Sequence, residues 1–110
     1  MKGEVFLTKQ EQYAFVYNNG NSWVNNKLVM KAVPNQLGFS RYGLSVSKQL
    51  GNAVVRNRTK RLLREILRVA SLKPGWDIIF IARKQAAGTQ YGELEKTLKN
   101  LLSRAHILAE

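Results

Sequence analysis

The sequence predicts an α+β fold, a single-domain sandwich in which a small mixed sheet carries packed helices. The main observation is a helical pattern at residues 52–68, which lies between two strand-like stretches at 41–47 and 76–83. Two further helical patterns lie near the ends of the chain. Helices and strands in this order, without a repeat, a linker or a low-complexity tract, indicate one domain over residues 1–110.

The first predicted helix begins at a capping box. Thr8 is the expected N-cap and Glu11 is the acid three residues later, so the helix covers residues 9–17 or 9–18. The sequence Asn18-Asn19-Gly20 ends it.

Two tyrosines four residues apart share one face of this helix, so their rings can line up side by side. They are Tyr13 and Tyr17, whereas Phe15 points elsewhere. Aromatic rings in this arrangement can stack on the bases of single-stranded RNA. The alternative is that both tyrosines are half-buried core residues with hydrated hydroxyl groups.

The next part of the chain reads as a polar turn followed by two strands. Residues 21–26 are polar and turn-prone around Trp23, residues 27–33 form a predicted strand and residues 34–38 a loop. Residues 41–47 alternate strictly, with apolar side chains on one side. The other side is small and polar, which suits a groove or a close neighbour, and consists of Gly43, Ser45 and Ser47.

Residues 52–68 form the clearest predicted helix. Asn52 is the expected N-cap, and Gly51 allows a sharp turn before it. An apolar arc about 140° wide contains Val55, Thr59, Leu62, Leu63, Ile66 and Leu67. The rest of the helix is basic, with Arg58 near one margin of the arc and only Glu65 as an acid, and it carries Arg56, Asn57, Lys60, Arg61, Arg64 and Arg68.

The charge of this helix predicts a polyanionic partner. Cations four residues apart, such as Lys60 and Arg64, destabilise a helix by a few tenths of a kcal/mol per pair, so a helix selected only for stability would carry more acids. The whole chain has 18 Lys and Arg against 7 Asp and Glu, which gives a formal charge of +11. This charge indicates nucleic acid as the first partner class and an anionic membrane surface as the second. A solvated basic face without a ligand is the alternative.

The last third of the chain completes the sheet and adds a helix. Residues 71–75 break regular structure, and residues 76–83 are nearly all apolar, which is typical of an interior strand covered on both faces. Residues 91–106 repeat apolar positions at helical spacing and read as core packing. If the strands at 41–47 and 76–83 are parallel, the general rule predicts a right-handed crossover through the basic helix.

The composition argues against several classes of protein. No cysteine is present, which excludes disulfides and thiolate-bound zinc. Residues 1–7 lack the apolar run of a signal peptide, and no segment is long enough to span a membrane, so a soluble cytoplasmic protein is expected. The acids are scattered and His106 is alone, so the sequence predicts neither a catalytic carboxylate pair nor a metal cluster.

Residues 43–64 resemble the signature of the bacterial ribonuclease P protein subunit. The resemblance extends over the rest of the chain, from the aromatic helix that ends at Gly20 to the C-terminal helix. It implies a ribosomal-protein-like fold with an unusual left-handed βαβ crossover through the basic helix, against the general rule. The core of the signature is an Arg-Asn-Arg motif followed by Lys-Arg, here Arg56, Asn57, Arg58, Lys60 and Arg61.

The resemblance also implies a function and a set of site residues. In that family the catalyst is an RNA, and the protein binds this RNA and helps to hold precursor tRNA while the 5′ leader is removed. The residues then expected to contact the catalytic RNA are Arg56, Asn57, Arg58, Lys60, Arg61, Arg64 and Arg68. A cleft for the single-stranded leader is expected from Tyr13, Tyr17, Ser45, Ser47, Lys48 and Asn52.

One position departs from the family pattern. Lys31 stands where family members often carry a further aromatic residue, so leader contact there is expected to be electrostatic. The expected partners are ribonuclease P RNA, bound one to one, and precursor tRNA, with no membrane. Magnesium ions would be held mainly by the RNA and the substrate. Two alternatives remain: a ribosomal or other structured-RNA-binding module without a role in cleavage, and a protein-only nuclease or DNA-binding architectural protein.

Overall fold

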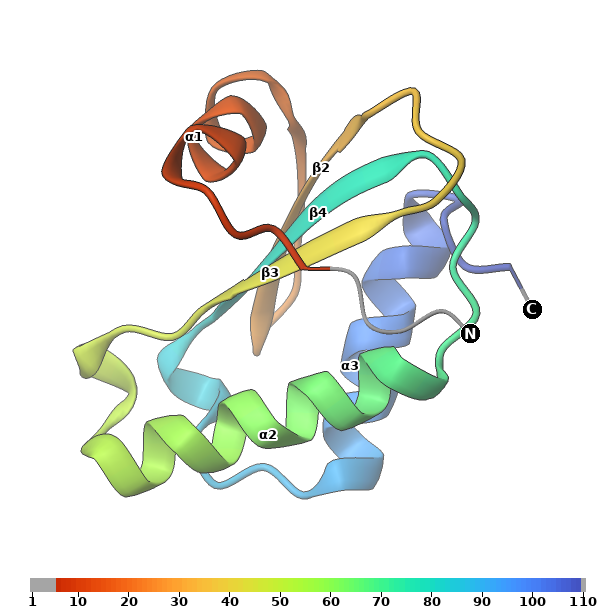
Figure 1. Cartoon of the computed structure of the whole chain (residues 1–110). Helices are drawn as coiled ribbons and strands as arrows, with labels where there is room; N and C mark the ends of the chain where they lie inside the picture. Colours follow the sequence, from red (N-terminus) through yellow and green to blue (C-terminus); the bar gives the residue numbers. More distant parts are fainter. Residues whose placement is uncertain (1–5, 110) are drawn as a thin grey trace.

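The computed structural model describes residues 6–109, which form three layers (Figure 1). Residues 1–5, which carry most of the stretch tested for a signal peptide, lie outside the described residues, as does Glu110. Helix α1 (Gln10–Asn19) lies on one face of a four-stranded sheet, and α2 (Ala53–Val69) and α3 (Tyr91–Arg104) lie on the other. The predicted α+β sandwich is confirmed.

The sheet is mixed. Its strands are β1 (Asn21–Val24), β2 (Leu28–Pro34), β3 (Arg41–Ser45) and β4 (Trp76–Ala82), in the spatial order β1-β2-β4-β3. Strand β4 pairs antiparallel with β2 and parallel with β3. Ile78 and Phe80 are buried on one face of β4 and Ile79 on the other, so the predicted interior strand is confirmed.

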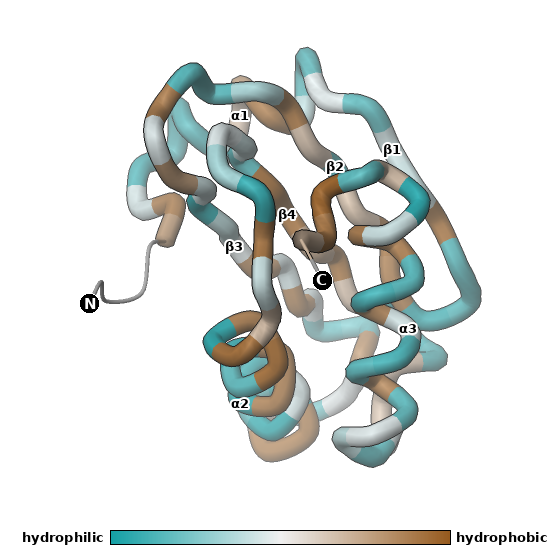
Figure 2. The backbone as a smooth tube through the Cα atoms, turned by 90° about the vertical axis from the view of Figure 1, so that its right-hand side faces the viewer, coloured by the Kyte–Doolittle hydropathy of each residue, from teal (hydrophilic) through white to brown (hydrophobic). Residues whose placement is uncertain are grey.

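The crossover from β3 through α2 to β4 is left-handed. In Figure 1, β3 runs from right to left nearest the viewer, α2 returns from left to right below the sheet, and β4 runs from right to left behind β3. Figure 2 shows the same order of strands from the side. The path therefore turns counter-clockwise as it moves away from the viewer. This is the arrangement implied by the family resemblance, and the general right-handed rule fails here.

The main core lies between the sheet and the two helices α2 and α3. Figure 2 shows hydrophobic stretches on β4 and on α2. Each fully buried large side chain contributes about 1.5–3 kcal/mol, and this core includes Leu28, Met30, Ile78, Phe80, Leu63, Ile66, Leu94, Leu98, Leu101 and Leu102. A smaller cluster under α1 contains Leu7, Val16 and Ile79.

The start of α2 is as predicted. The Asn52 side-chain oxygen accepts a hydrogen bond from the Val55 N–H at 3.1 Å. Gly51 has a φ of +152°, which only glycine adopts readily. The predicted apolar arc faces the core: its members from Thr59 to Leu67 are buried, and Val55 is half-buried.

The prediction of a polar turn at residues 21–24 is wrong, because these residues form the edge strand β1. Trp23 lies opposite Met30 of β2 and packs against the main core. Burial of this one large side chain outweighs the low strand propensity of its polar neighbours.

Two of the shifts in predicted boundaries have a local cause. The N-cap of α1 is Lys9 instead of Thr8, and Gln12 takes the role assigned to Glu11: its side-chain oxygen accepts from the N–H groups of Thr8 at 2.8 Å and Lys9 at 3.0 Å. Strand β3 ends two residues early, because the Ser47 hydroxyl accepts from the Gln49 N–H at 3.3 Å and begins a short 3-10 helix, η1 (Lys48–Leu50).

Candidate RNA-binding surface

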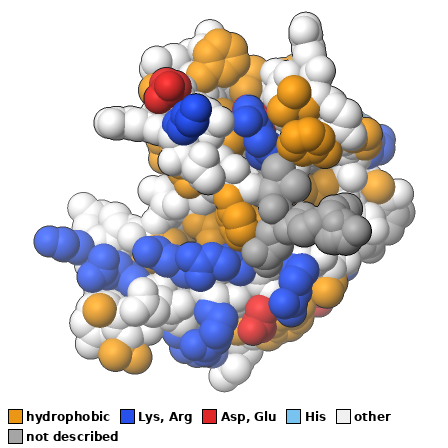
Figure 3. Space-filling model, in the orientation of Figure 1, with side chains coloured by type: hydrophobic (Ala, Val, Ile, Leu, Met, Phe, Trp, Pro, Cys, Tyr) orange, Lys and Arg blue, Asp and Glu red, His pale blue; other side chains and the backbone are white. Residues whose placement is uncertain are grey.

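The basic side of α2 carries charge without local compensation. Figure 3 shows Lys and Arg side chains in a band across this helix. Arg61, Arg64 and Arg68 are exposed, and Lys60 is half-buried. None of the ion pairs formed among residues 6–109 includes a cation of α2. The mutual repulsion predicted from the sequence is therefore not relieved within the described chain, and a polyanion would relieve it.

Arg58 differs from the other α2 cations because it is bonded inside the protein. Its Nη1 atom donates to the Thr89 carbonyl at 3.2 Å, and the side chain is half-buried. Thr89 lies in the connection between β4 and α3. Arg58 therefore helps to hold this connection against α2, in addition to the RNA contact expected from the sequence.

Helix α1 divides the opposite face of the sheet into two halves. Val16 packs beneath it against Ile79. Gln12 and Phe15 project from one flank and line a pocket of about 450 Å³ with residues at the start of β3 and β4. Because Tyr13 and Tyr17 project from the opposite flank, they face the half of the sheet in which β3 ends.

Tyr13 rests directly on β3. A Cβ atom built on Gly43 would lie 2.5 Å from the Tyr13 hydroxyl oxygen and 2.6 Å from Cζ, so only glycine leaves room for the ring. The close neighbour that the small face of this strand predicts is therefore Tyr13. Tyr17, one turn later, is 39% exposed.

Lys31 and Ser45 lie on the same face of the sheet as these tyrosines. In the register of the sheet, Lys31 of β2 pairs with Ile79 of β4, and Ile79 pairs with Gly43 of β3. Ser45 lies two residues after Gly43 on β3, so it shares this face. The Lys31 ammonium donates to the Ser22 hydroxyl at 2.8 Å, which draws it toward the β1 edge. The structure thus places a cation, and no aromatic ring, at this position.

The remaining predicted cleft residues lie where β3 ends. Ser47, Lys48 and Asn52 are exposed in the turn between β3 and α2. A second short 3-10 helix, η2 (Lys84–Ala86), packs against η1 and brings Arg83 and Lys84 to the same end of the sheet. Both are exposed.

Lys84 is a site candidate that the sequence analysis missed. It reaches the end of the sheet where η1 lies because β3 and β4 are parallel, and parallel strands end at the same edge of a sheet. That rule was the signal that could have found it. Arg83 differs, because its Nη1 atom donates to the Asn25 carbonyl at 2.7 Å and so holds the guanidinium at the turn between β1 and β2.

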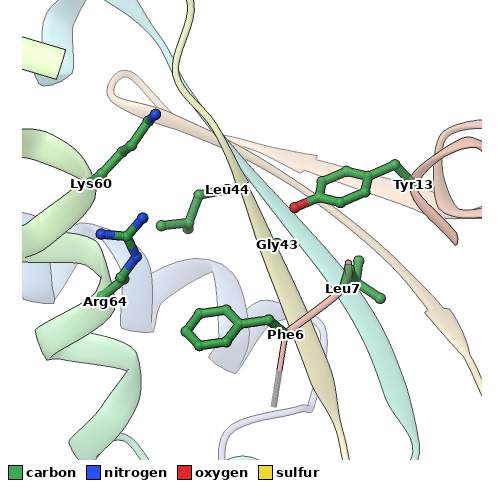
Figure 4. A pocket seen from close by; sticks show the side chains of 7 residues that line it. All are labelled: Phe6, Leu7, Tyr13, Gly43, Leu44, Lys60 and Arg64. Carbon is green, nitrogen blue, oxygen red and sulfur yellow. The ribbon is translucent and has the colours of Figure 1, made fainter. Parts of the chain in front are cut away.

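One pocket joins the two groups of residues that the sequence predicted separately. Its volume is about 300 Å³, and it lies between α1, β3 and α2 (Figure 4). Tyr13 enters it from the α1 side, and Lys60 and Arg64 reach it from α2. Tyr17, Lys31 and Ser45 do not line it. The tyrosine of the expected leader cleft therefore faces two cations of the expected catalytic-RNA face.

The pocket on the other flank of α1 is lined by two acids, the exposed Glu11 and the buried Asp77, and Asp77 is fully engaged. Arg41 donates to Asp77 through two bonds, Nε to Oδ1 at 2.9 Å and Nη2 to Oδ2 at 2.7 Å, and the Asn35 amide donates to Asp77 Oδ1 at 2.8 Å. The hydrogen bond to Asp77 is the largest influence on the pKa of Arg41 and raises it; burial acts in the opposite direction, and the negative charge of Asp77 adds a further rise. This cluster fixes the start of β3 against β4.

Within residues 6–109, no three of the His, Asp and Glu side chains come together as metal ligands. In the same part of the chain, no helix is long and apolar enough to cross a membrane.

Comparison with known proteins identifies the family. A family model described as Ribonuclease P matches residues 1–106. The ribonuclease P protein component of Dehalococcoides mccartyi is 50% identical over 110 residues, which cover 100% of this chain and 92% of that protein. The corresponding protein of Clostridioides difficile is 39% identical over 104 residues, covering 92% and 91%.

Solved structures agree with this result. The RNase P protein of Staphylococcus aureus superimposes with a TM-score of 0.87 at 32% identity, covering 96% of this chain and 99% of that one. The RNase P protein from Thermotoga maritima gives a TM-score of 0.83 at 30% identity, covering 90% and 96%. This chain therefore belongs to the ribonuclease P protein family, whose role is in tRNA processing.

Proposed function

We propose that this chain is the RNA-binding subunit of ribonuclease P, and that it holds the catalytic RNA through α2 and the 5′ leader of precursor tRNA beside α1. The observation that carries the proposal is the pocket in which Tyr13 faces Lys60 and Arg64. An aromatic platform next to a positive groove is the usual arrangement for binding a single strand. The same cations belong to a helix whose charge suits the phosphates of a folded RNA.

The catalytic RNA would contact the exposed side of α2. The side chains assigned to it are Arg56, Asn57, Lys60, Arg61, Arg64 and Arg68, with Arg58 contributing through its free guanidinium nitrogens. Arginine is suited to this contact because its planar fork can bind two phosphate oxygens at once. The absence of ion pairs on this helix within residues 6–109 supports the assignment.

The leader would follow the half of the sheet that α1 leaves open toward the end of β3. Tyr13 and Tyr17 would stack on bases at about 1–3 kcal/mol per base. Lys31 and Lys48 would neutralise backbone phosphates, with Ser45, Ser47 and Asn52 as hydrogen-bonding neighbours. Lys84 extends this positive surface because η2 packs against η1.

In this proposal the protein acts by charge and position. Two RNA molecules repel each other, and magnesium ions normally offset that repulsion. By supplying cations at the contact between them and by holding the leader, the protein would strengthen substrate binding and lower the magnesium requirement. The ions that hydrolyse the phosphodiester are assigned to the RNA and the substrate. The complex is proposed to contain one protein per catalytic RNA and to act in the cytoplasm.

The test is cleavage of a precursor tRNA at low magnesium concentration. Three reactions are compared: this protein alone, a bacterial ribonuclease P RNA alone, and the two together. Release of the leader only by the mixture is the expected result. Cleavage by the protein alone would overturn the non-catalytic assignment. Tight binding with no gain in cleavage would instead identify a structural RNA-binding module.

A further inference from the structure

We propose that the outer edge of β3 at Leu44 holds one unpaired RNA nucleotide, whose base hydrogen-bonds to the Leu44 backbone while its phosphates meet Lys60 and Arg64. This inference rests on the proposed function and deepens it, because it names a nucleotide subsite. The subsite is the pocket of Figure 4.

The backbone of Leu44 supplies the hydrogen-bonding groups of the subsite. Strand β3 is at the edge of the sheet, so one side of its backbone points away from β4. The segment before α1 covers the beginning of this edge: Phe6 forms a parallel bridge with Tyr42, and the Leu7 N–H donates to the Tyr42 carbonyl at 2.9 Å. Because backbone groups along a strand alternate in direction, the N–H and carbonyl of Leu44 point outward as those of Tyr42 do.

Beyond Tyr42 this edge is left open by the residues that the structure describes. The chain leaves the strand at Thr8 and enters α1 after its N-cap, Lys9. Among residues 6–109, no backbone hydrogen bond made outside the sheet ladders reaches Leu44. A donor and an acceptor therefore stand side by side at the wall of the pocket.

The other walls supply the groups that a nucleotide needs. The pocket volume of about 300 Å³ is at the lower end of the range for small-ligand sites. Figure 4 shows the Tyr13 hydroxyl above Gly43, with Lys60 and Arg64 across from it and the Phe6 ring on a third side. The phenol and the phenyl ring offer apolar and aromatic contact, and the two cations suit phosphate oxygens.

The chemistry of these walls favours a nucleotide over an added peptide strand. A peptide could also pair with a strand edge, but its backbone carries no charge to match Lys60 and Arg64. A base such as adenine presents an acceptor beside an amino donor, which complements an N–H beside a carbonyl. Protein groups reach such a base edge in RNA when the nucleotide is unpaired. The nucleotide can come from the leader or from the catalytic RNA.

Amide hydrogen exchange, followed by NMR on the full-length protein, tests the inference and separates the two sources. One arm adds a single-stranded pentanucleotide with the sequence of a precursor tRNA leader, and the other adds ribonuclease P RNA. The expected result is that exchange of the Leu44 amide slows by about tenfold or more in one arm. The Ser45 amide, which points toward β4, is the internal control and should not change. Protection of Leu44 in neither arm would overturn the subsite.

A pair of substitutions tests the same hydrogen bond. Leu44→Pro removes the outward N–H while the ladder to β4 remains, and proline is tolerated at a strand edge. Leu44→Ala loses the same side chain but keeps the N–H. The RNA that protects the Leu44 amide should bind about three- to tenfold more weakly to Leu44→Pro than to Leu44→Ala. Equal affinities would contradict the proposal, and if Leu44→Pro does not fold, the exchange experiment on the unchanged protein decides.

The cleavage assay at low magnesium distinguishes this inference from the proposed function. If the protein stimulates cleavage but the Leu44 amide is unprotected in both arms, the nucleotide subsite is refuted and the proposed function is retained. If the protein gives no stimulation, the proposed function itself falls.

Discussion

The contact between Tyr13 and Gly43 predicts that one added methyl group will weaken leader binding. In Gly43→Ala the new Cβ would lie 2.5–2.7 Å from the Tyr13 atoms Oη, Cζ and Cε2, closer than real Cβ contacts. The strand backbone cannot move away because it is paired with β4. The ring of Tyr13 must therefore shift, and the leader would lose the stacking surface assigned to it.

The size of the effect follows from the stacking energy. Loss of one base–aromatic contact costs about 1–3 kcal/mol, which corresponds to about a 5- to 150-fold rise in Kd. The assay is binding of precursor tRNA to the complex of protein and catalytic RNA, with mature tRNA in parallel. Affinity for the precursor should fall and affinity for mature tRNA should be unchanged. The free energy of unfolding should change little, because the preference of a strand for alanine over glycine, roughly 0.5–1 kcal/mol, offsets the displacement of the Tyr13 ring.

Two control variants test whether Gly43 acts through the Tyr13 ring. Gly38→Ala adds the same methyl group where no atom lies within 4 Å, so it should bind precursor normally. In a Tyr13→Ala background the methyl group has room, so Gly43→Ala should add no further loss to that of Tyr13→Ala. Additive losses in the double variant, or equal losses for precursor and mature tRNA, would show that Gly43 does not act through the ring.

Three further outcomes are expected. Arg61→Ala should weaken binding of the catalytic RNA and make the salt dependence of that binding shallower by about one log-log unit or less, without changing stability. Arg58→Ala should also lower the free energy of unfolding by about 1 kcal/mol, because it loses an internal hydrogen bond. Filter binding and urea titration measure the two effects, and identical behaviour of the two variants would contradict this difference. Arg41→Ala leaves the Asp77 carboxylate, with its side chain 7% exposed, without its cation and should cost roughly 2–4 kcal/mol in urea unfolding. Because folding raises the pKa of Arg41, the stability from its charge is fully present below the pKa that Arg41 has in the unfolded chain, and it is lost only at strongly alkaline pH. The destabilisation by Arg41→Ala should therefore be constant near neutral pH. A marked pH dependence there would argue against this account. Asn52→Ala should destabilise the protein by about 1 kcal/mol through loss of the α2 N-cap, and an unchanged urea midpoint would contradict that role.

The fold could largely be predicted because its main signals are local. The apolar arc of α2, its Asn52 cap and the continuous apolar run of β4 each follow from a short stretch of sequence. Strand β1 escaped prediction because its stability comes from the packing of Trp23 beside β2 and against the core, which is a contact between segments. The handedness of the crossover also cannot be predicted from local sequence patterns, and only the family resemblance implied it.

The candidate site was predictable as two separate groups of residues but not as one pocket. Helical spacing places Tyr13 and Tyr17 on one face of α1. It likewise places Lys60 and Arg64 on one face of α2, but it does not predict that these two faces meet. They meet because α1 and α2, on opposite faces of the sheet, both reach the edge strand β3. The same reason explains why Lys84 was missed, since only strand pairing brings η2 beside η1.

The alternation of β3 limits where this protein can accept extra residues. A one-residue insertion in the strand before Gly43 would exchange its two faces and place Tyr42 beneath Tyr13, where Gly43 now leaves room for the ring. Length variation among natural relatives should therefore concentrate in the loops on either side of the strands. Gly38, which lies in the loop before β3 and has open space around it, is a suitable position for a fluorophore or an affinity handle in single-molecule studies of the assembled complex.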